Sequence, residues 1–399
     1  MATDRSIAPP RMRAPRRRRA LSDVVDLRLP FDPILAFAAI ALTIASVVTL
    51  DGAQGSSYVT RQALYGVLGI GIAVVVSRFD YARWPRYRWG LYGFMIASIL
   101  AVAALGQSVN GSTLSLNLGF FSFQASELGK VLAAVVGASF IVMRGHAVSS
   151  WRTTLGLLAI VLLPAALTRD FGTSLVYAAM ALSLLLIGGT PGRHLAVIGV
   201  SAMVVIVSVL GVLPAAGVDV LKPYQVDRFT AFLSPGGTNE AVDGNDPTYQ
   251  LRQSKAAIGS GGKTGKGDDA TQQKLGFLPE SETDFVFASA GERFGFVGVA
   301  AILSLFALIM WRGLRILSTA RDFYGAVLAA GILAMLLFQV LVNAGMNVGI
   351  MPITGIPLPL VSYGGSSVLS TYLAIGLLQA IYAQGRAAAR RGPTVDRTD

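Results

Sequence analysis

Long apolar runs recur along almost the whole chain, and short polar segments separate them. About ten runs are long enough to cross a hydrocarbon core as helices. The pattern predicts an all-α polytopic membrane protein, with one transmembrane domain over residues 31–385. The short polar segment TRDFGTS barely separates the fifth run from the sixth. The approximate limits of the runs are residues 33–50, 62–77, 90–106, 126–143, 153–168, 171–189, 195–214, 284–311, 323–345 and 367–384.

The polar segments differ in charge from one side of the predicted bundle to the other. Arginines fill alternate short loops, such as 78–89 and 144–152, and the loops between them are nearly free of Lys and Arg. Because cytoplasmic loops carry the excess of basic residues, both termini are predicted to be cytoplasmic. Residues 1–30 then form a basic cytoplasmic tail that is attracted to anionic membrane lipids, and residues 386–399 form a second tail.

One extracytoplasmic loop is much longer than the others and covers about residues 215–283, before the eighth helix. Its basic residues do not overturn the orientation, because long loops are exempt from the charge rule. Within it, YQLRQSKAAIGSG predicts an amphipathic helix that lies in the membrane interface.

Composition limits the chemistry that this chain can perform. Hydrophobic residues make up 53% of the chain and charged residues 14%, where a soluble protein would carry about a quarter charged residues. There is no Cys, and the two histidines, His146 and His194, are placed in short cytoplasmic loops. The net charge of +11 follows from the loop arginines and does not indicate nucleic-acid binding. Carboxylates are therefore the candidate bases on the outer side.

The most informative carboxylate is Asp284, which stands where the long loop meets the eighth apolar run. Ionisable residues at such positions often face a cavity, whereas a carboxylate at a helix N-terminus also has a structural role as a cap. The pattern alone leaves both roles open. The small residues Ala288, Gly291 and Gly295 lie on the same helical face as Asp284 and leave room for a neighbouring helix or a ligand.

Three further segments carry candidate groups. Glu127 and Lys130 are spaced to form a salt bridge at the start of the fourth helix. Glu292 is expected to form a structural ion pair with Arg293. The segment AIGSGGKT (257–264) is one residue short of a phosphate-binding loop, so either its backbone N–H groups and lysines hold an anion such as a pyrophosphate or it is a flexible polar loop.

Taken in order, these segments resemble the SEDS family (shape, elongation, division and sporulation) over about residues 33–384. Within that family, PITGIPLPLVSYGGSS is similar to the RodA, elongation-type members rather than to the FtsW, division-type members. The segments that carry the resemblance are FFSFQASELGK, RDFGTSLV, YQVDRFTAFLSP, YQLRQSKAAIGSGGKTGKG, TQQKLGFLPESETDFVFASAGERFGFVG and NAGMNVGIMPITGIPLPLVSYGGSS.

The resemblance implies a peptidoglycan glycosyltransferase that polymerises lipid II at the outer face of the bacterial cytoplasmic (inner) membrane. It further implies a class B penicillin-binding protein and the elongation machinery as partners. By motif, Asp284 matches the family's essential aspartate, and the chain departs from the family at Ala125, Arg169 and Arg293. The residues expected to bind substrate are Glu127, Lys130, Arg228, Lys255, Lys263, Lys266 and Ser366.

The expected mechanism uses Asp284 as a general base, or as a group that helps to hold a divalent cation, Mg²⁺ or Mn²⁺. Cations of the long loop, with Lys130, are expected to stabilise the diphosphates. Three alternatives remain open at this point: a division-type polymerase, a lipid II flippase or other transporter, and a scaffold that only recruits a penicillin-binding protein.

Overall fold

The fold is described from a computed structural model. The residues that it describes are 31–51, 56–109, 112–117, 119, 121–145, 149–168, 170–215, 226, 228, 232, 246–271, 275 and 277–391. The predictions made for the tail 1–30, for His146, for Arg169 and for residues 392–399 lie outside them.

Within the described ranges, nine helices are long and apolar enough to cross a membrane, and Phe171–Ile187 is a shorter apolar helix. Together they coincide with the runs predicted from the sequence, which confirms a multi-pass helical membrane protein. The helices are α1 (Pro33–Asp51), α2 (Ser56–Ser77), α3 (Arg88–Leu105), α4 (Ala125–Arg144), α5 (Trp151–Thr168), α6 (Phe171–Ile187), α7 (Gly192–Val207), α12 (Val286–Ser318), α13 (Phe323–Val348) and α14 (Gly365–Arg391).

The boundary between α5 and α6 is set by Asp170. Its carboxylate accepts hydrogen bonds from the main-chain N–H groups of Gly172 (3.2 Å) and Thr173 (3.1 Å), which caps the start of α6. A cap of this kind satisfies N–H groups that the first helical turn leaves without partners. Within the polar segment between the fifth and sixth runs, Asp170 is therefore the helix cap of α6.

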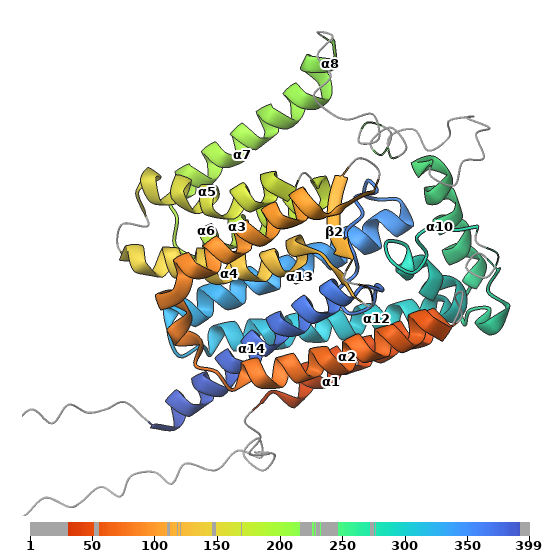
Figure 1. Cartoon of the computed structure of the whole chain (residues 1–399), viewed down its shortest axis with the longest axis horizontal. Coiled ribbons are helices and arrows are strands. Elements are labelled where there is room, and N and C mark those ends of the chain that lie inside the picture. The colour runs from red at the N-terminus through yellow and green to blue at the C-terminus, as the bar shows by residue number, and fades with distance from the viewer. Residues whose placement is uncertain are drawn as a thin grey trace, which may run out of the picture. The chain divides into compact units, whose positions relative to one another are not determined.

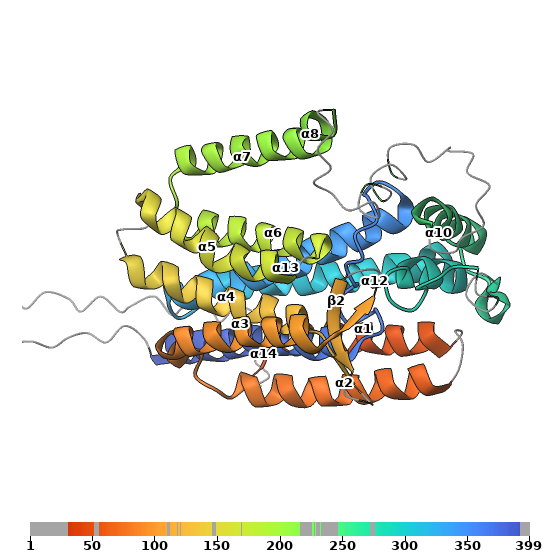
Figure 2. The ribbon, with the colours of Figure 1, turned by 45° about the horizontal axis from the view of Figure 1, so that its top comes forward.

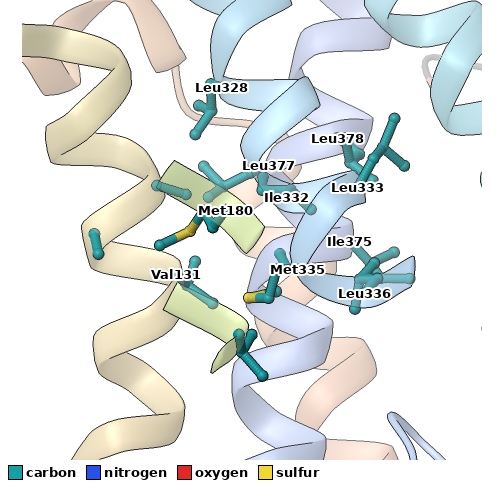
Figure 3. Packing of buried hydrophobic residues seen from close by; sticks show 14 of the residues in the cluster. Val131, Met180, Leu328, Ile332, Leu333, Met335, Leu336, Ile375, Leu377 and Leu378 are labelled. Carbon is teal, nitrogen blue, oxygen red and sulfur yellow. The ribbon is translucent and has the colours of Figure 1, made fainter. Parts of the chain in front are cut away.

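The core lies where α4, α6, α13 and α14 meet. Val131, Met180, Ile332, Met335 and Ile375 come together there from these four helices (Figure 3). Glycines permit close approach: a Cβ at Gly331 of α13 would lie 3.0 Å from Leu184 of α6. Small residues at helix contacts are the usual solution in membranes, where lipid tails are as apolar as the side chains.

Helix α7 has little protein around it. No residue of its apolar window is buried, and Figure 2 shows it set apart from α5 and α6. Only His194, in its first turn, is buried, where it stacks on Trp151 at 3.8 Å between ring centroids and hydrogen-bonds Thr154 at 2.8 Å. The prediction that His194 lies in a loop was wrong, since the helix begins two residues earlier.

Smaller elements gather at one end of the helices, the end that the arginine pattern assigns to the outside (Figure 1). Strands β1 (Gln107–Val109), β2 (Ser112–Asn117) and β3 (Ser122–Phe123) form an antiparallel sheet in the order β1-β2-β3. The sequence analysis did not predict these strands. The predicted amphipathic helix is present as α10 (Pro247–Gly261). The other short elements are η4 (Ser208–Val212), α8 (Leu213–Ala215) and η5 (Gly267–Asp269), and η2 (Tyr81–Tyr87) lies at the opposite end, in the arginine-rich loop 78–89.

Candidate active site

The main chain around Asp284 is fixed from two directions. The side-chain amides of Asn343 and Asn347, both on α13, donate to the Asp284 carbonyl oxygen at 2.9 and 3.1 Å. The hydroxyl of Ser362 donates to the preceding carbonyl, that of Thr283, at 2.5 Å. Hydrogen bonds from buried side chains hold a segment in one conformation. The segment before α12 is thus held rigidly at the start of the helix.

The Asp284 side chain does not cap α12. The helix is preceded by Phe285, and no side chain makes a capping hydrogen bond there. The carboxyl instead lies beside Gly355, whose φ is +71°. A Cβ added to Gly355 would lie 3.3 Å from Asp284 Oδ2 and 3.5 Å from Arg228 Nη1. The capping interpretation of Asp284 was therefore wrong, and an acid and a guanidinium both lie close to Gly355.

The surroundings of Asp284 shift the pKa of its carboxyl group. The pKa of Asp284 is raised to about 7, mainly by burial and also by the nearby Glu280 and Asp170 carboxylates, against the opposing effect of Arg228. Loss of hydration and like charges disfavour the ionised form of a carboxyl group, and a neighbouring cation favours it. A carboxyl group that titrates near neutral pH is suited to accept a proton during catalysis.

The loop that carries Gly355 is seated against the start of α6. A Cβ at Gly172 would lie 2.5 Å from the Thr354 carbonyl oxygen, so the two backbones are in close contact. This contact brings the α6 cap, Asp170, into the electrostatic surroundings of Asp284. The charge-free PITGIP segment is the signal for this arrangement, because irregular backbone at membrane depth must be buried or line a cavity.

Glu127 and Lys130 form the predicted salt bridge, with 2.7 Å between the two charged groups. Both side chains are buried, at 3% and 2% exposure. A pair this deeply buried is held in one geometry, and removing either partner would leave a costly unpaired charge. Next to the pair, a Cβ at Gly129 would lie 2.5 Å from the Tyr177 hydroxyl, which places this part of α4 against α6. Among the described residues, the hydrogen bonds and ion pairs of this pair do not extend to Asp284.

The glycine-rich segment after α10 has a structural task. Helix α12 is interrupted at Gly295, whose φ is 64° and ψ −162°. The carbonyl oxygens of Gly262 and Lys263 accept hydrogen bonds from Phe296 and Val297, at 2.9 and 3.1 Å, where the helix resumes. The segment thus supplies carbonyl groups to the point where α12 resumes, and the anion-binding role of its N–H groups and lysines stays a prediction.

Glu292 pairs with a different cation from the one predicted. Its buried carboxylate lies 3.2 Å from Lys266 Nζ and accepts a hydrogen bond from the Thr271 main chain at 3.0 Å. Arg293 instead binds Asp268 at 3.2 Å and donates to the Val48 carbonyl oxygen of α1 at 2.7 Å. The expected Glu292–Arg293 pair was wrong because consecutive helical residues point in different directions.

The small-residue face of α12 receives a neighbouring helix, as predicted for Gly291. A Cβ on Gly261 of α10 would lie 2.0 Å from the Gly291 carbonyl oxygen, so the two backbones touch at this crossing.

Lys255 and Ser366, two other predicted substrate ligands, contact separate elements. A Cβ at Gly349, which ends α13, would lie 2.5 Å from Lys255 Nζ. The Ser366 hydroxyl donates to the Ser122 carbonyl oxygen at 2.8 Å and accepts from the Gln124 N–H at 2.8 Å, which ties β3 to α14. Of the predicted residues, Arg228 is the one whose placement beside Asp284 is established. The sequence analysis did not single out Gly355, Asn343, Asn347 or Glu280.

The fold and the site define a class: a multi-pass helical membrane protein with a recessed, tunable carboxyl group at one end of its bundle. The family model for cell cycle proteins of the FtsW, RodA and SpoVE type matches residues 28–387. The chain belongs to this family, the SEDS proteins.

Named relatives cover most of the chain. It is 34% identical to the peptidoglycan glycosyltransferase MrdB of Escherichia coli strain K12, over 89% of this chain and 94% of that protein. It is also 34% identical to the probable peptidoglycan glycosyltransferase FtsW of Thioalkalivibrio sulfidiphilus, over 88% and 86%. Stage V sporulation protein E of Bacillus subtilis is 31% identical over 86% and 93%.

Solved structures share the fold. A chain from a study of how a peptidoglycan synthase complex coordinates polymerization and crosslinking superimposes with a TM-score of 0.74 at 28% identity, over 90% of this chain and 99% of that one. The rod shape determining protein RodA of Thermus thermophilus superimposes with a TM-score of 0.63 at 24% identity, over 89% and 97%.

Proposed function

We propose that this peptidoglycan glycosyltransferase polymerises lipid II into glycan strands at the outer face of the bacterial cytoplasmic membrane, and that it serves cell elongation. The observation that carries the proposal is that the Asp284 carboxyl and the Arg228 guanidinium both lie beside Gly355. A base for the acceptor hydroxyl and a cation for a diphosphate are the two groups that this reaction needs.

In the proposed reaction, the Asp284 carboxylate takes the proton from the acceptor sugar hydroxyl as that oxygen attacks the anomeric carbon of the donor. A glycosidic bond forms, the bond from the anomeric carbon to the diphosphate oxygen breaks, and undecaprenyl diphosphate leaves. A carboxyl group with a pKa near 7 is matched to a proton transfer at neutral pH. Because hydrogen bonds fix the main chain at Asp284, the carboxylate is held in position to reach the acceptor hydroxyl.

Arg228 is proposed to stabilise the charge that develops on the departing diphosphate, because it is the cation beside Asp284. Lys130, Lys255, Lys263, Lys266, Glu127 and Ser366 stay predictions as substrate-binding residues. Among the described residues, no group of three or more His, Asp or Glu side chains is placed to hold a metal ion. A Mg²⁺ or Mn²⁺ ion at Asp284 would then draw part of its ligands from the diphosphate, as Mg²⁺ does in many phosphate sites.

The sequence of one segment supports an elongation role. PITGIPLPLVSYGGSS resembles the elongation-type members. Relatives named FtsW and MrdB are equally similar in identity to this chain, so the test is biological. Expression in a strain depleted of its elongation polymerase should restore rod shape, whereas restoration of division in an FtsW-depleted strain would assign the division role.

The proposed partner is a class B penicillin-binding protein that crosslinks the strands. Support comes from the similarity to a chain of a complex that coordinates polymerization with crosslinking. Purified protein should convert labelled lipid II into polymer, and more so with such a partner present. Movement of lipid II across vesicles without polymer would instead support a flippase.

A further inference from the structure

Aromatic side chains from three separate elements meet at the outer end of the bundle. Tyr58 and Tyr65 come from α2, Phe121 from the residue before β3, and Tyr363 from the loop before α14. The ring centroids of Tyr58 and Tyr363 are 4.8 Å apart in an edge-to-face arrangement, those of Tyr65 and Tyr363 are 6.3 Å apart, and those of Tyr65 and Phe121 are 6.1 Å apart. We call these four residues the aromatic shelf.

The shelf is held in place by specific contacts. A Cβ on Gly365, the first residue of α14, would lie 2.7 Å from the Phe121 ring and 3.1 Å from Tyr65. A larger side chain at this position would therefore collide with both rings. The Gln62 amide of α2 donates to the Ser362 carbonyl oxygen at 3.2 Å. Tyr65 is buried as the base of the shelf, whereas Tyr58, Phe121 and Tyr363 are partly exposed.

The shelf continues directly into the active-site segment. The Tyr363 N–H donates to the Glu282 carbonyl oxygen at 2.8 Å, and Ser362 binds the Thr283 carbonyl oxygen at 2.5 Å. Glu282 and Thr283 are the two residues that precede Asp284. A ligand on the exposed rings would therefore lie next to the group proposed to act as base.

The charge around the aromatic shelf determines which part of the substrate can bind there. The carboxylates of Glu282 and Glu280 contribute negative potential at the Tyr58 hydroxyl, and the Arg61 guanidinium contributes positive potential there. Two acids against one base disfavour a diphosphate. The same carboxylates accept hydrogen bonds from hydroxyl groups. Aromatic faces carry partial negative charge and attract the weakly positive C–H groups that cover the flat side of a pyranose ring.

We propose that the aromatic shelf is a sugar-binding subsite that holds the growing glycan strand beside Asp284 through its pyranose rings. The inference rests on the proposed polymerase function and adds a determinant of strand length to it. A strand that stays on the shelf after each transfer is kept for the next one, so the shelf favours long products.

An interfacial aromatic belt is the competing interpretation, because Tyr and Trp gather where a membrane meets water. Belt residues contact lipid headgroups individually. Here the rings pack on one another, and one of them belongs to a segment hydrogen-bonded to the residues before Asp284. A belt residue would have no influence on product length.

The test compares Tyr58→Leu with Tyr58→Phe in the full-length purified protein. Lipid II conversion gives the initial rate and gel separation gives the glycan length. Loss of one aromatic contact weakens binding of a soluble uncrosslinked glycan oligomer by about fivefold. Tyr58→Leu should therefore bind the oligomer about fivefold more weakly and make shorter strands. Tyr58→Phe, which keeps the ring, should match the wild type in length. Tyr249→Leu, on α10 at the same end, is the matched control and should change neither.

The outcomes separate the inference from the function on which it rests. Wild-type protein that makes no polymer contradicts the proposed function. Wild-type polymer with an unchanged length distribution and unchanged oligomer binding in Tyr58→Leu overturns the shelf alone. If Tyr58→Leu is less stable in detergent, Tyr363→Leu replaces it, since the Tyr363 main-chain hydrogen bond to Glu282 is independent of its side chain.

Discussion

The side-chain amide of Asn343 joins the two segments that make the active site, because it donates to the carbonyl oxygens of Asp284 at 2.9 Å and Ile356 at 2.8 Å. One segment carries the carboxyl group proposed as the base, and the other follows Gly355. Asn343 is fully buried on α13, so its position is set by helix packing. The distance between acid and loop is thus fixed by a residue that has no charge of its own.

Replacement of Asn343 by Leu should lower both the stability of the protein and its rate of polymerisation. Two buried carbonyl groups lose a donor, which costs about 1–3 kcal/mol of stability. Displacement of the base should lower the initial rate of polymerisation by roughly tenfold to a hundredfold. Thermal unfolding in detergent and lipid II conversion are the two measurements. Ser183→Ala, which removes a hydrogen bond to the Ala330 carbonyl oxygen elsewhere in the bundle, should leave the rate unchanged. A wild-type rate in Asn343→Leu would contradict the positioning role.

The rate should depend on pH through Asp284. Only the ionised carboxyl can accept a proton, so kcat/KM should rise with pH and reach half its plateau near pH 7. Arg228 lowers the pKa of Asp284, so Arg228→Gln should move this midpoint to higher pH and Arg228→Lys should move it less. Profiles measured at constant ionic strength decide the point. A wild-type midpoint near 4 would show that the titrating group is not this carboxyl.

Substitution of Gly355 by Ala should disturb the pair directly. The added methyl group would stand 3.3 Å from Asp284 Oδ2 at a residue whose φ is +71°. Such a backbone conformation costs a non-glycine residue about 1–3 kcal/mol, and the crowding falls on the acid and on Arg228. We expect a large loss of polymerisation with a moderate loss of stability. Gly199→Ala on α7, where an added Cβ meets no atom within 4 Å, is the control. Equal activity of the two variants would argue against close contact at Gly355.

Substitution of Lys266 tests whether this lysine has a structural role or binds substrate. Because it pairs with the buried Glu292, Lys266→Met should lower stability by about 1–2 kcal/mol, a value reduced by the partial exposure of the lysine. Adding Glu292→Gln should recover part of this loss, because no charge is then left buried and unpaired. A raised KM for lipid II with unchanged thermal unfolding would instead support the diphosphate-binding prediction.

The helices could be predicted because each apolar run must satisfy its own backbone in lipid. Asp284 could be singled out because a carboxylate at the end of such a run is costly. Of its neighbours, Arg228 was predicted as a substrate-binding residue but not as a neighbour of Asp284, and Gly355 and Asn343 were not predicted. These residues are far apart in sequence, and only the packing of α13 and of the segment that carries Gly355 brings them together. The Glu292 partner was missed for the same reason, since Lys266 reaches it from a segment 26 residues away.

The strands β1 to β3 were missed for a different reason. They are short, and the sequence analysis did not use the alternation of Leu114, Leu116 and Leu118 with polar residues, which is the pattern of a half-buried strand. Their attachment depends on Ser366, whose hydroxyl holds the Ser122 and Gln124 main chains. Ser366 was predicted to bind substrate, and in the structure its hydroxyl hydrogen-bonds the main chains of Ser122 and Gln124.

The central claim is that Asp284 is the base for lipid II polymerisation. The most direct measurement is the initial rate of conversion of labelled lipid II by purified Asp284→Asn, compared with wild type and with Asp246→Asn, which keeps an amide cap on α10. We predict that Asp284→Asn remains folded and makes no polymer, while Asp246→Asn is as active as wild type. Polymerisation by folded Asp284→Asn at a rate comparable to wild type would contradict the account.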